Sequence, residues 1–415
     1  MKNIDVIIFV EHQDRELTVS KLLKEEMEKL NLSVIIASIM FEAPGILFKY
    51  RPKAIVTPYI GFGKNSISEF FSRYYGTTIN YYNLNYEQIL FPFTGSFKIP
   101  KNGMAKNHQI NFCWGENFKT FLNSHGVPES NLFISGRPYS ATISVKNKNR
   151  AVIRDSIFSI NNLDKSKKLI FIALTDSLAL SPYSKVERIV KKDGDYDALH
   201  RQIQWDKNTI NQLLRIIEQT AQEKFYSQFN FVLRPHPTLD VRDYRRLIND
   251  LGITLPENFK IIKNGDAISW LIASDYFITN YSTLILDAIE INKPVFTINS
   301  NDTKTIDYLW LVNHNDCSFN DIKELTYLLS QEKEKVLQRV NSSWLRDLNA
   351  IEEIAKVVKS QVQLLNNYPV KIKLTPSLIP YLIRQKLYKF WLKNYNQKIP
   401  LIKESQAVDY FEIIE

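Results

Sequence analysis

Short runs of aliphatic and β-branched residues alternate along this chain with longer amphipathic stretches. The first run, Asp5 to Val10 (DVIIFV), predicts a buried strand, and Leu22, Leu23, Met27 and Leu30 then share one face of a predicted helix. Strands alternating with helices are typical of an α/β protein with parallel sheets. Further strands are predicted at 32–38, 54–57, 77–82, 111–114, 132–135, 168–174, 229–233, 259–262, 276–279 and 294–298, and further helices at 116–124, 208–225, 244–251, 268–273 and 283–291.

The pattern divides into two similar halves. A polar and basic stretch at 146–150 and 161–168 separates the two series of strands, and 415 residues are too many for one ordinary core. We therefore predict one domain at residues 1–150, a second at 151–330, and C-terminal helices with a basic tail at 331–415. Two α/β domains joined in this way are expected to face each other across a cleft, where ligands usually bind.

Composition narrows the class of protein. With 44% hydrophobic and 23% charged residues, the chain suits a globular fold, which excludes disorder as its main state. Cys113 and Cys317 form no CxxC motif, so we expect reduced thiols in a cytoplasmic chain, without a metal or redox role. No apolar run is long enough for a membrane span, and no signal-peptide pattern occurs. The formal charge of +9 fits a nucleic acid, an anionic membrane surface or an anionic small substrate.

The strand predicted at 229–233 ends in Arg234-Pro235-His236-Pro237. The two prolines exclude a helix and hold His236 in an extended turn at the carboxyl end of the strand, where open α/β sheets bind ligands. An imidazole fixed beside a guanidinium suits a phosphate, because charge-assisted hydrogen bonds contribute about 1.5–3 kcal/mol each. The alternative is a structural turn whose histidine caps a neighbouring helix.

A second polar turn follows the strand predicted at 276–279. Asn280 and Tyr281 lead into Ser282 and Thr283, whose hydroxyl groups precede a predicted helix and would either cap it or help to bind an anion. A further polar turn, Thr175-Asp176-Ser177, follows the strand predicted at 168–174.

Together the two turns resemble the donor site of GT-B glycosyltransferases. The likeness is greatest to bacterial polysialyltransferases, capsule Kdo transferases and CDP-glycerol glycerophosphotransferases, whose His-Pro and Ser/Thr motifs bind the phosphate of a cytidine nucleotide. Arg234-Pro235-His236-Pro237 and Ser282-Thr283 match those motifs position by position. A looser match, to bacterial surface-carbohydrate biosynthesis proteins, covers 112–119, His125-Gly126 and 132–138. In those proteins the last strand ends in a TGNPR-like pattern, and this chain has Ser-Gly-Arg-Pro there.

The resemblance implies a GT-B fold of two Rossmann-like domains, the first for the acceptor and the second for the nucleotide-sugar donor. It implies that the donor phosphate is bound, and the charge developing on it stabilised, by fixed protein groups without a metal or other cofactor. These groups would be Arg234, His236, Pro237, Ser282 and Thr283, with His236 also catalytic. Because GT-B proteins often place the loop after the first strand of the second domain against the donor, the resemblance also makes Thr175, Asp176 and Ser177 candidates for contact with nucleotide or sugar, with an ordinary polar turn as the alternative. Asp193-Gly194-Asp195 is similar to the metal-binding DxD of GT-A enzymes, but it lies in a charged loop, so we expect no metal there.

In the first domain, the candidates for acceptor chemistry also follow predicted strands. Glu87 is the candidate general base, because a carboxylate that burial makes more basic can take the proton of the acceptor hydroxyl. The alternative is a glutamate that begins a helix. After the first strand, the candidates for contact with the acceptor or sugar, with a solvated loop as the alternative, are Glu11, His12 and Arg15, beside Asp14; His108 is a further candidate.

Near the end of the chain, Lys371 to Lys398 holds seven basic and no acidic residues. Basic residues interleave there with large apolar ones, which predicts a basic amphipathic helix suited to an anionic membrane surface. The alternative is a helix that packs on the domains with its lysines in solvent. The apolar residues of this pattern are Leu382, Ile383, Leu387, Phe390 and Trp391.

These observations and the resemblance predict a cytoplasmic, metal-independent glycosyltransferase, peripheral at the inner face of the membrane if its basic helix binds lipid. It would transfer an ulosonic acid of Kdo or sialic-acid type from a CMP-activated donor to a bacterial surface polysaccharide or lipid-linked glycan. CDP-glycerol or CDP-ribitol phosphotransfer, nucleotide-sugar epimerisation and a non-enzymatic protein that binds nucleic acid or a membrane stay open. No nucleic-acid partner is expected, because no recognised nucleic-acid-binding fold accompanies the charge.

Overall fold

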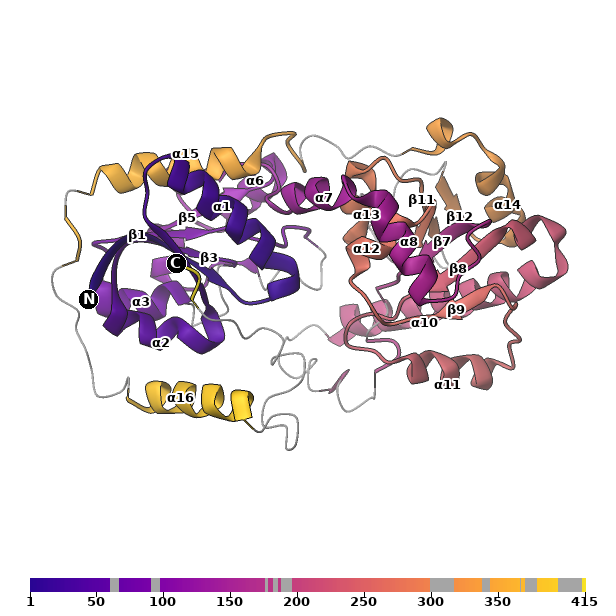
Figure 1. Cartoon of the computed structure of the whole chain (residues 1–415). Coiled ribbons are helices and arrows are strands. Elements are labelled where there is room, and N and C mark those ends of the chain that lie inside the picture. The colour runs from indigo at the N-terminus through magenta and orange to yellow at the C-terminus, as the bar shows by residue number, and fades with distance from the viewer. Residues whose placement is uncertain are drawn as a thin grey trace. The chain divides into compact units, whose positions relative to one another are not determined.

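The computed structural model describes residues 1–59, 67–90, 98–175, 178–181, 186–187, 196–298, 317–337, 344–365, 367–369, 379–394 and 413–415. Their strands form two six-stranded sheets in which neighbouring strands run parallel, which confirms the predicted α/β class (Figure 1). The chain folds into two compact units. Unit 1 comprises Met1–Leu90, Thr94–Thr142 and Asn341–Glu415, and unit 2 comprises Phe91–Phe93 and Ile143–Val340.

The sheet of unit 1 has the strand order β2-β1-β3-β4-β5-β6. Val6 of β1 pairs with Val34 on one side and Ala54 on the other, so β1 lies between the two strands that follow it. The six strands are β1 (Lys2–Val10), β2 (Val34–Ser38), β3 (Tyr50–Thr57), β4 (Asn80–Asn83), β5 (Gln109–Cys113) and β6 (Leu132–Ile134).

Both faces of this sheet are covered by helices, because successive strand residues point to opposite faces and both sets are apolar. Val6, Ile8 and Val10 pack with α1 (Thr18–Lys29) and α15 (Ala350–Gln363). Ile7 and Phe9 pack instead with α2 (Ile39–Lys49) and α3 (Ile67–Tyr75) (Figure 1). The remaining helices of the first part of the chain are α5 (Gly103–Asn107), α6 (Glu116–Ser124) and α7 (Tyr139–Asn147), and α16 (Ile379–Asn394) is the last helix described.

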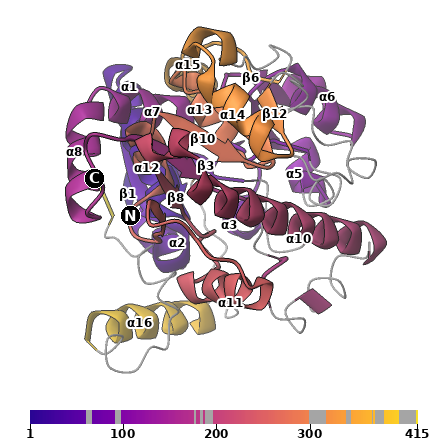
Figure 2. The same cartoon turned by 90° about the vertical axis from the view of Figure 1, so that its right-hand side faces the viewer.

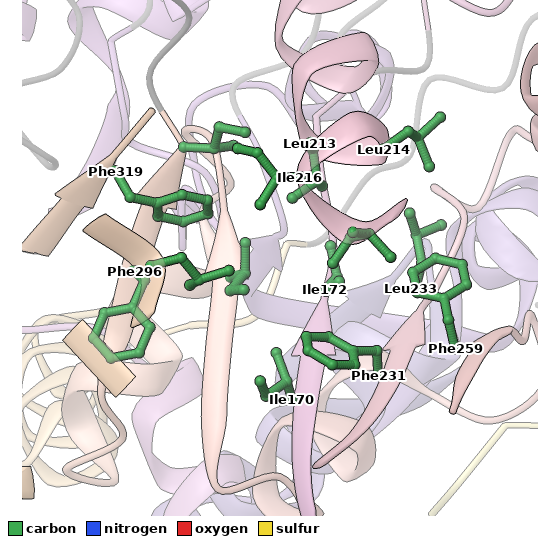
Figure 3. Close-up of a cluster of buried hydrophobic side chains, with 14 of the residues drawn as sticks. Ile170, Ile172, Leu213, Leu214, Ile216, Phe231, Leu233, Phe259, Phe296 and Phe319 are labelled. Carbon is green, nitrogen blue, oxygen red and sulfur yellow. The ribbon is translucent and has the colours of Figure 1, made fainter. Parts of the chain in front are cut away.

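The sheet of unit 2 has the order β12-β11-β10-β7-β8-β9. On one face Ile170, Ile172, Phe231 and Leu233 pack against the long helix α10 (Tyr196–Gln219), as Figure 3 shows. The strands are β7 (Lys168–Ile172), β8 (Phe229–Leu233), β9 (Phe259–Ile261), β10 (Tyr276–Thr279), β11 (Val295–Ile298) and β12 (Ser318–Phe319). The other α-helices in the described part of this unit are α8 (Arg150–Ile160), α11 (Val241–Leu251), α12 (Ala267–Ala273), α13 (Leu284–Glu290) and α14 (Ile322–Ser330).

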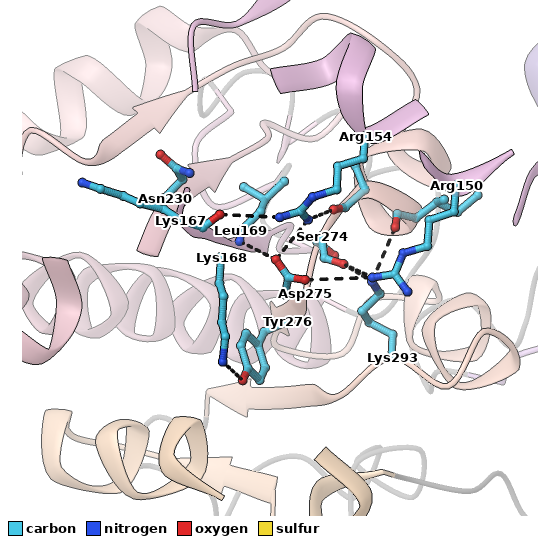
Figure 4. Close-up of polar contacts among 12 residues, drawn as sticks. Arg150, Arg154, Lys167, Lys168, Leu169, Asn230, Ser274, Asp275, Tyr276 and Lys293 are labelled. Carbon is cyan, nitrogen blue, oxygen red and sulfur yellow. Dashed lines mark hydrogen bonds and ion pairs between the residues drawn. The ribbon is translucent and has the colours of Figure 1, made fainter. Parts of the chain in front are cut away.

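A polar cluster fastens α8 to the amino end of this sheet (Figure 4). Arg154 of α8 forms an ion pair with Asp275 at 3.0 Å, and the same carboxylate accepts a hydrogen bond from the backbone N–H of Leu169 at 2.8 Å. Lys293 is 3% exposed and its ammonium group donates to the carbonyl of Ser274. Burial, and then the charge of Arg150, lower the pKa of Lys293 to about 7.

The predicted elements agree with most of the observed ones, and β8, β10 and α6 have the predicted limits. The polar stretch at 146–150 joins the end of α7 to the start of α8, between the last strand of the first sheet and the first strand of the second. One expectation is wrong, because the helix predicted from residue 208 begins at Tyr196. In addition α2 was not predicted, since it contains Pro44, which disfavours a helix, yet Phe41, Ile46 and Leu47 are fully buried.

Candidate active site

The connections of unit 2 change direction at β7. The chain passes from β7 to β8 and β9 on one side, then returns to place β10 and β11 on the other side. In open α/β sheets, ligands bind outside the carboxyl ends of the strands at such a switch point. The loops there begin at Ala173 after β7, at Arg234 after β8 and at Asn280 after β10, so both predicted phosphate turns flank the same central strand.

Asn280 joins the loops that follow β7 and β10. Its side-chain oxygen accepts hydrogen bonds from the backbone N–H of Thr175 at 2.9 Å and of Tyr281 at 2.8 Å. Because Asn280 is only 1% exposed, it fixes both loops from inside. Thr175, a predicted contact residue, is half-buried in this arrangement. Asp176 and Ser177 lie outside the described residues.

The turn after β8 holds His236 in a defined tautomer. The backbone N–H of Thr238 approaches the ring nitrogen Nδ1 at 3.3 Å, and the Thr238 hydroxyl lies 3.0 Å from the same atom. Because Nδ1 accepts the backbone hydrogen bond, a neutral imidazole carries its proton on Nε2. The half-buried His236 ring therefore has an N–H donor that suits a phosphate oxygen. Pro237 beside it is exposed.

Arg234 has a structural function as well as its predicted one. Its backbone N–H donates to the carbonyl of Ile172 at 2.9 Å, and its guanidinium donates to the carbonyl of Gly265 at 3.2 Å and 2.9 Å. Two of the five guanidinium N–H groups are thus used to hold the loop after β9. Arg234 is half-buried. It directly follows β8, two residues before His236, so it belongs to the loop at the carboxyl end of the sheet.

Ser282 and Thr283 immediately precede α13, as predicted. The hydroxyl oxygen of Ser282 accepts a hydrogen bond from the backbone N–H of Leu284 at 3.3 Å. Thr283 is at the N-cap position, but its side chain makes no cap hydrogen bond and is exposed, so the capping alternative does not account for its hydroxyl. Ser282 is half-buried in the same turn.

A buried polar cluster on α10 supports the turn after β10, and sequence reasoning missed it. The hydroxyl of Tyr281 lies 3.0 Å and 3.1 Å from the carboxylate oxygens of Asp206 and 3.2 Å from the carbonyl of Thr175. Gln202, one helical turn before Asp206, donates to the same hydroxyl, and the ring of Trp205 lies 5.3 Å from that of Tyr281. The sequence signal for this cluster was a pair of polar residues, Gln202 and Asp206, four positions apart on the apolar side of an amphipathic helix. Figure 2 shows α10 from the side.

Unit 1 has a switch point of its own between β1 and β3, and the predicted acceptor residues lie at its carboxyl end. Glu11 follows β1 and accepts a hydrogen bond from the Tyr59 hydroxyl, which follows β3, at 2.9 Å. The imidazole of His12 lies 3.5 Å from the Glu11 carboxylate. Burial, and then the charge of Glu11, raise the pKa of Tyr59. The side chain of Asp14 is outside the described part of the structure.

Glu16 organises this cluster and was not predicted. Its side chain is fully buried, and one carboxylate oxygen accepts hydrogen bonds from the backbone N–H groups of Glu11 at 2.7 Å and His12 at 3.2 Å. The other oxygen pairs with the guanidinium of Arg15 at 2.6 Å and 3.1 Å. Burial alone would lower the pKa of Arg15, but the charges of Glu16 and Glu87 outweigh that effect and raise it. Sequence gave no signal for Glu16, which lies beside more exposed charges in the same turn.

Arg15 also brings Glu87 into the cluster, at 3.1 Å. The expectation that Glu87 is buried is wrong, because its side chain is 63% exposed. It projects from a loop whose conformation is held by hydrogen bonds of the neighbouring residues Asn85 and Gln88. Gln88 accepts from the backbone N–H of Trp114 at 2.7 Å, and Asn85, at a φ of 48°, bonds to Asn83 at 2.7 Å. His108 is exposed at the end of α5.

Among the described residues, no cluster of three or more His, Cys, Asp or Glu side chains could hold a metal ion. Asp193-Gly194-Asp195 lies outside those residues. The expected absence of a metal therefore stays a prediction. None of the helices described is both long and apolar enough to cross a bilayer.

No protein-family model and no curated protein matches this sequence. Solved structures do match it. A UDP-GlcNAc 2-epimerase from Methanocaldococcus jannaschii has a TM-score of 0.58 at 11% identity, with 87% of this chain and 100% of that chain covered. The epimerase from Neisseria meningitidis, bound to UDP-GlcNAc, has a TM-score of 0.53 at 14% identity, with 88% and 100% covered.

The wall teichoic acid polymerase TagF, in a structure soaked with CDPG, has a TM-score of 0.50 at 15% identity, with 88% of this chain and 90% of that chain covered. At such low identities these likenesses show the fold alone. Each of them covers 87% or 88% of this chain. The chain has the GT-B fold of two Rossmann-like α/β units, as predicted.

Proposed function

We propose that this chain is a metal-independent glycosyltransferase that uses a CMP-activated ulosonic acid, of Kdo or sialic-acid type, as donor. The acceptor would be a bacterial surface polysaccharide or a lipid-linked glycan. The observation that carries the proposal is the position of the His236 and Ser282 turns, which flank β7 at the switch point of unit 2. Both residues belong to motifs that resemble phosphate-binding motifs of cytidine-nucleotide enzymes.

The proposed step places fixed donors around the leaving phosphate. As the acceptor oxygen bonds to the anomeric carbon, the bond from that carbon to the phosphate oxygen breaks and CMP leaves with the electron pair. The Nε2–H of His236, the Ser282 and Thr283 hydroxyls and the Arg234 guanidinium would stabilise the charge that develops on it. Donors that are already in place need no reorganisation during the reaction, which makes such stabilisation effective.

Unit 1 would supply the acceptor site and the general base. Glu87 is the proposed base, since its carboxylate is accessible and Arg15 fixes its position. It would take the proton that the acceptor hydroxyl loses, while Glu11, His12 and Arg15 contact the acceptor.

A second candidate is transfer of glycerol phosphate or ribitol phosphate from a CDP-linked donor. The likeness to TagF favours it, because that enzyme's structure was soaked with CDPG and covers 88% of this chain. The same residues would bind the donor, but the acceptor oxygen would attack phosphorus instead of an anomeric carbon, and CMP would again leave.

Incubation with CMP-Kdo, CMP-sialic acid, CDP-glycerol and UDP-GlcNAc, with detection of released nucleotide, separates these functions. CMP released from a CMP-sugar supports the first function, and CMP released only from CDP-glycerol supports the second. Conversion of UDP-GlcNAc to its 2-epimer would instead favour the activity of the epimerases that share the fold. If no nucleotide raises the melting temperature and salt abolishes all binding, the non-enzymatic alternative holds.

Glu87→Gln tests the base. We expect the transfer rate to fall roughly 100-fold or more, because a glutamine cannot accept the proton. Glu129→Gln is the matched control, since Glu129 is also an exposed glutamate of unit 1 paired with a basic residue, Lys119. Full transfer by the Glu87→Gln enzyme would show that the base is a different group.

A further inference from the structure

Helix α16 has apolar residues on two sides, and one of these sides packs on the described residues of its own unit. Leu382 lies against the apolar cluster of α2 and α3, Gln385 is 7% exposed, and Lys389 forms an ion pair with the buried Glu42 of α2. These three residues are spaced by three and four positions and so share one face. They fix α16 beside α2 (Figure 1).

The other apolar side faces solvent. Ile379, Ile383, Leu387 and Phe390, here called the α16 stripe, are between 54% and 60% exposed. Their spacing of four, four and three positions places them in one row along the helix. Among the described residues, Leu382 already anchors α16 to unit 1, so the packing that they show does not require a second row of large apolar side chains.

Cationic side chains border the α16 stripe. Arg384 and Lys386 are exposed, and α16 contains no acidic residue. On a helical projection Arg384 lies on one side of the stripe and Lys386 on the other, since they stand one residue after Ile383 and one residue before Leu387. An apolar row between positive charges is complementary to a bilayer with anionic headgroups, into which such a helix sinks its apolar side while its cations remain among the phosphates.

We propose that the α16 stripe docks this protein on the surface of a membrane that contains anionic lipid. The 16-residue helix lies in the plane of the interface, with Ile379, Ile383, Leu387 and Phe390 toward the acyl chains. Arg384 and Lys386 contact headgroup phosphates. The contacts of Lys389 with Glu42 and of Leu382 with unit 1 keep the helix attached to the protein during docking. The proposal does not depend on the glycosyltransferase function.

Sedimentation of the full chain with vesicles tests it. We expect binding to vesicles of phosphatidylcholine mixed with phosphatidylglycerol, weak binding to phosphatidylcholine alone, and weaker binding at high salt. Ile383→Ser/Leu387→Ser should weaken binding at least about tenfold, because two large side chains lose their apolar burial. Arg384→Gln/Lys386→Gln should weaken binding to the anionic vesicles by about tenfold or more, and binding to the neutral vesicles should stay unchanged.

Two matched controls keep the test specific. Val152→Ser/Ile160→Ser removes two exposed apolar residues of α8, and Arg245→Gln/Arg246→Gln removes two exposed charges of α11. Both should bind vesicles as the wild type does. Equal loss in the controls, or no binding of the wild type to anionic vesicles, would overturn the proposal. A wild-type dimer in sedimentation velocity that Ile383→Ser/Leu387→Ser converts to a monomer would also overturn it, since a second copy would then cover the stripe.

Discussion

His236 is oriented by a contact two residues ahead of it, the backbone N–H of Thr238. That contact sets which ring nitrogen can donate, and it depends on the Pro235 and Pro237 turn that the sequence shows directly. The residue type and the turn were therefore predictable, because prolines restrict the local backbone whatever the rest of the fold does. The direction in which Nε2 points was not predictable, since it depends on the conformation of the folded loop.

Replacing His236 tests the phosphate site. His236→Ala should lower nucleotide release from the active donor roughly 100-fold or more, because one fixed donor to the developing charge is lost. His125→Ala is the control, since His125 directly follows α6 in unit 1 and its Nδ1 lies 2.8 Å from the carbonyl oxygen of Phe121. Steady-state kinetics with both variants measures the effect. Unchanged turnover in His236→Ala would remove His236 from the mechanism.

Lys293 couples stability to pH. Its pKa falls from an ordinary 10.5 to about 7, first through burial and then through the charge of Arg150. Between these two values the unfolded chain binds the proton and the native protein does not, so this site makes the native state more stable as pH rises through that range. Below about pH 7 both states are protonated, and the cost of the buried charge is complete.

Lys293→Met removes this titration. The difference in unfolding free energy, wild type minus variant, should increase from about pH 7 to about pH 10 with a limiting slope of roughly 1.4 kcal/mol per pH unit. Urea denaturation of both proteins at the two pH values measures it. A difference that does not change with pH would mean that native Lys293 keeps its ordinary pKa.

At the scale of elements, side chains of helix α10 stabilise the turn after β10. The side chains of Asp206 and Gln202 form hydrogen bonds with the hydroxyl of Tyr281. Tyr281 directly precedes Ser282, so these bonds hold the Ser282 turn. The period of apolar residues predicted the second half of α10, where Leu213 and Ile217 face the sheet. Its first half was not predicted, because polar residues occupy buried positions there and break the apolar pattern.

Tyr281→Phe removes the hydroxyl and leaves the ring. We expect a loss of about 1–3 kcal/mol of stability, because the buried Asp206 loses a donor, together with several-fold weaker nucleotide binding as the Asn280–Ser282 turn shifts. Tyr327→Phe is the control, since Tyr327 is 64% exposed on α14. Thermal unfolding and calorimetric titration with CMP measure the two effects. Lower stability with unchanged nucleotide affinity would limit Tyr281 to a structural role.

At the scale of the whole molecule, the end of the chain returns to the first strands of unit 1. Ile414 forms an antiparallel bridge with Ile36 of the edge strand β2, through hydrogen bonds of 3.0 Å and 2.9 Å. Glu415 meets Lys2 at 2.8 Å and the hydroxyl of Tyr50 at 2.6 Å. These contacts cover part of the backbone that an edge strand leaves unpaired.

Ile414→Pro tests this closure. Proline removes the N–H that donates to Ile36, so we expect a loss of about 1–2 kcal/mol and a melting temperature lower by roughly 2–6 °C. Ile414→Ala keeps the hydrogen bond and loses only apolar contact, which separates the two contributions. If proline and alanine have equal effects, the backbone bridge contributes nothing measurable.

The α/β class, most strand positions and the polar turns were predictable from local sequence, because periodicity and proline act over a few neighbouring residues. With the resemblance it also led to the GT-B fold, which the structure has. The position of β7 between β8 and β10 follows from the folded sheet, and it places the His236 and Ser282 turns on either side of one strand. The burial of Glu16 and Asp206 also results from the tertiary fold. Burial and ion pairing depend on segments distant in sequence, and the order in which parallel strands assemble brings those segments together.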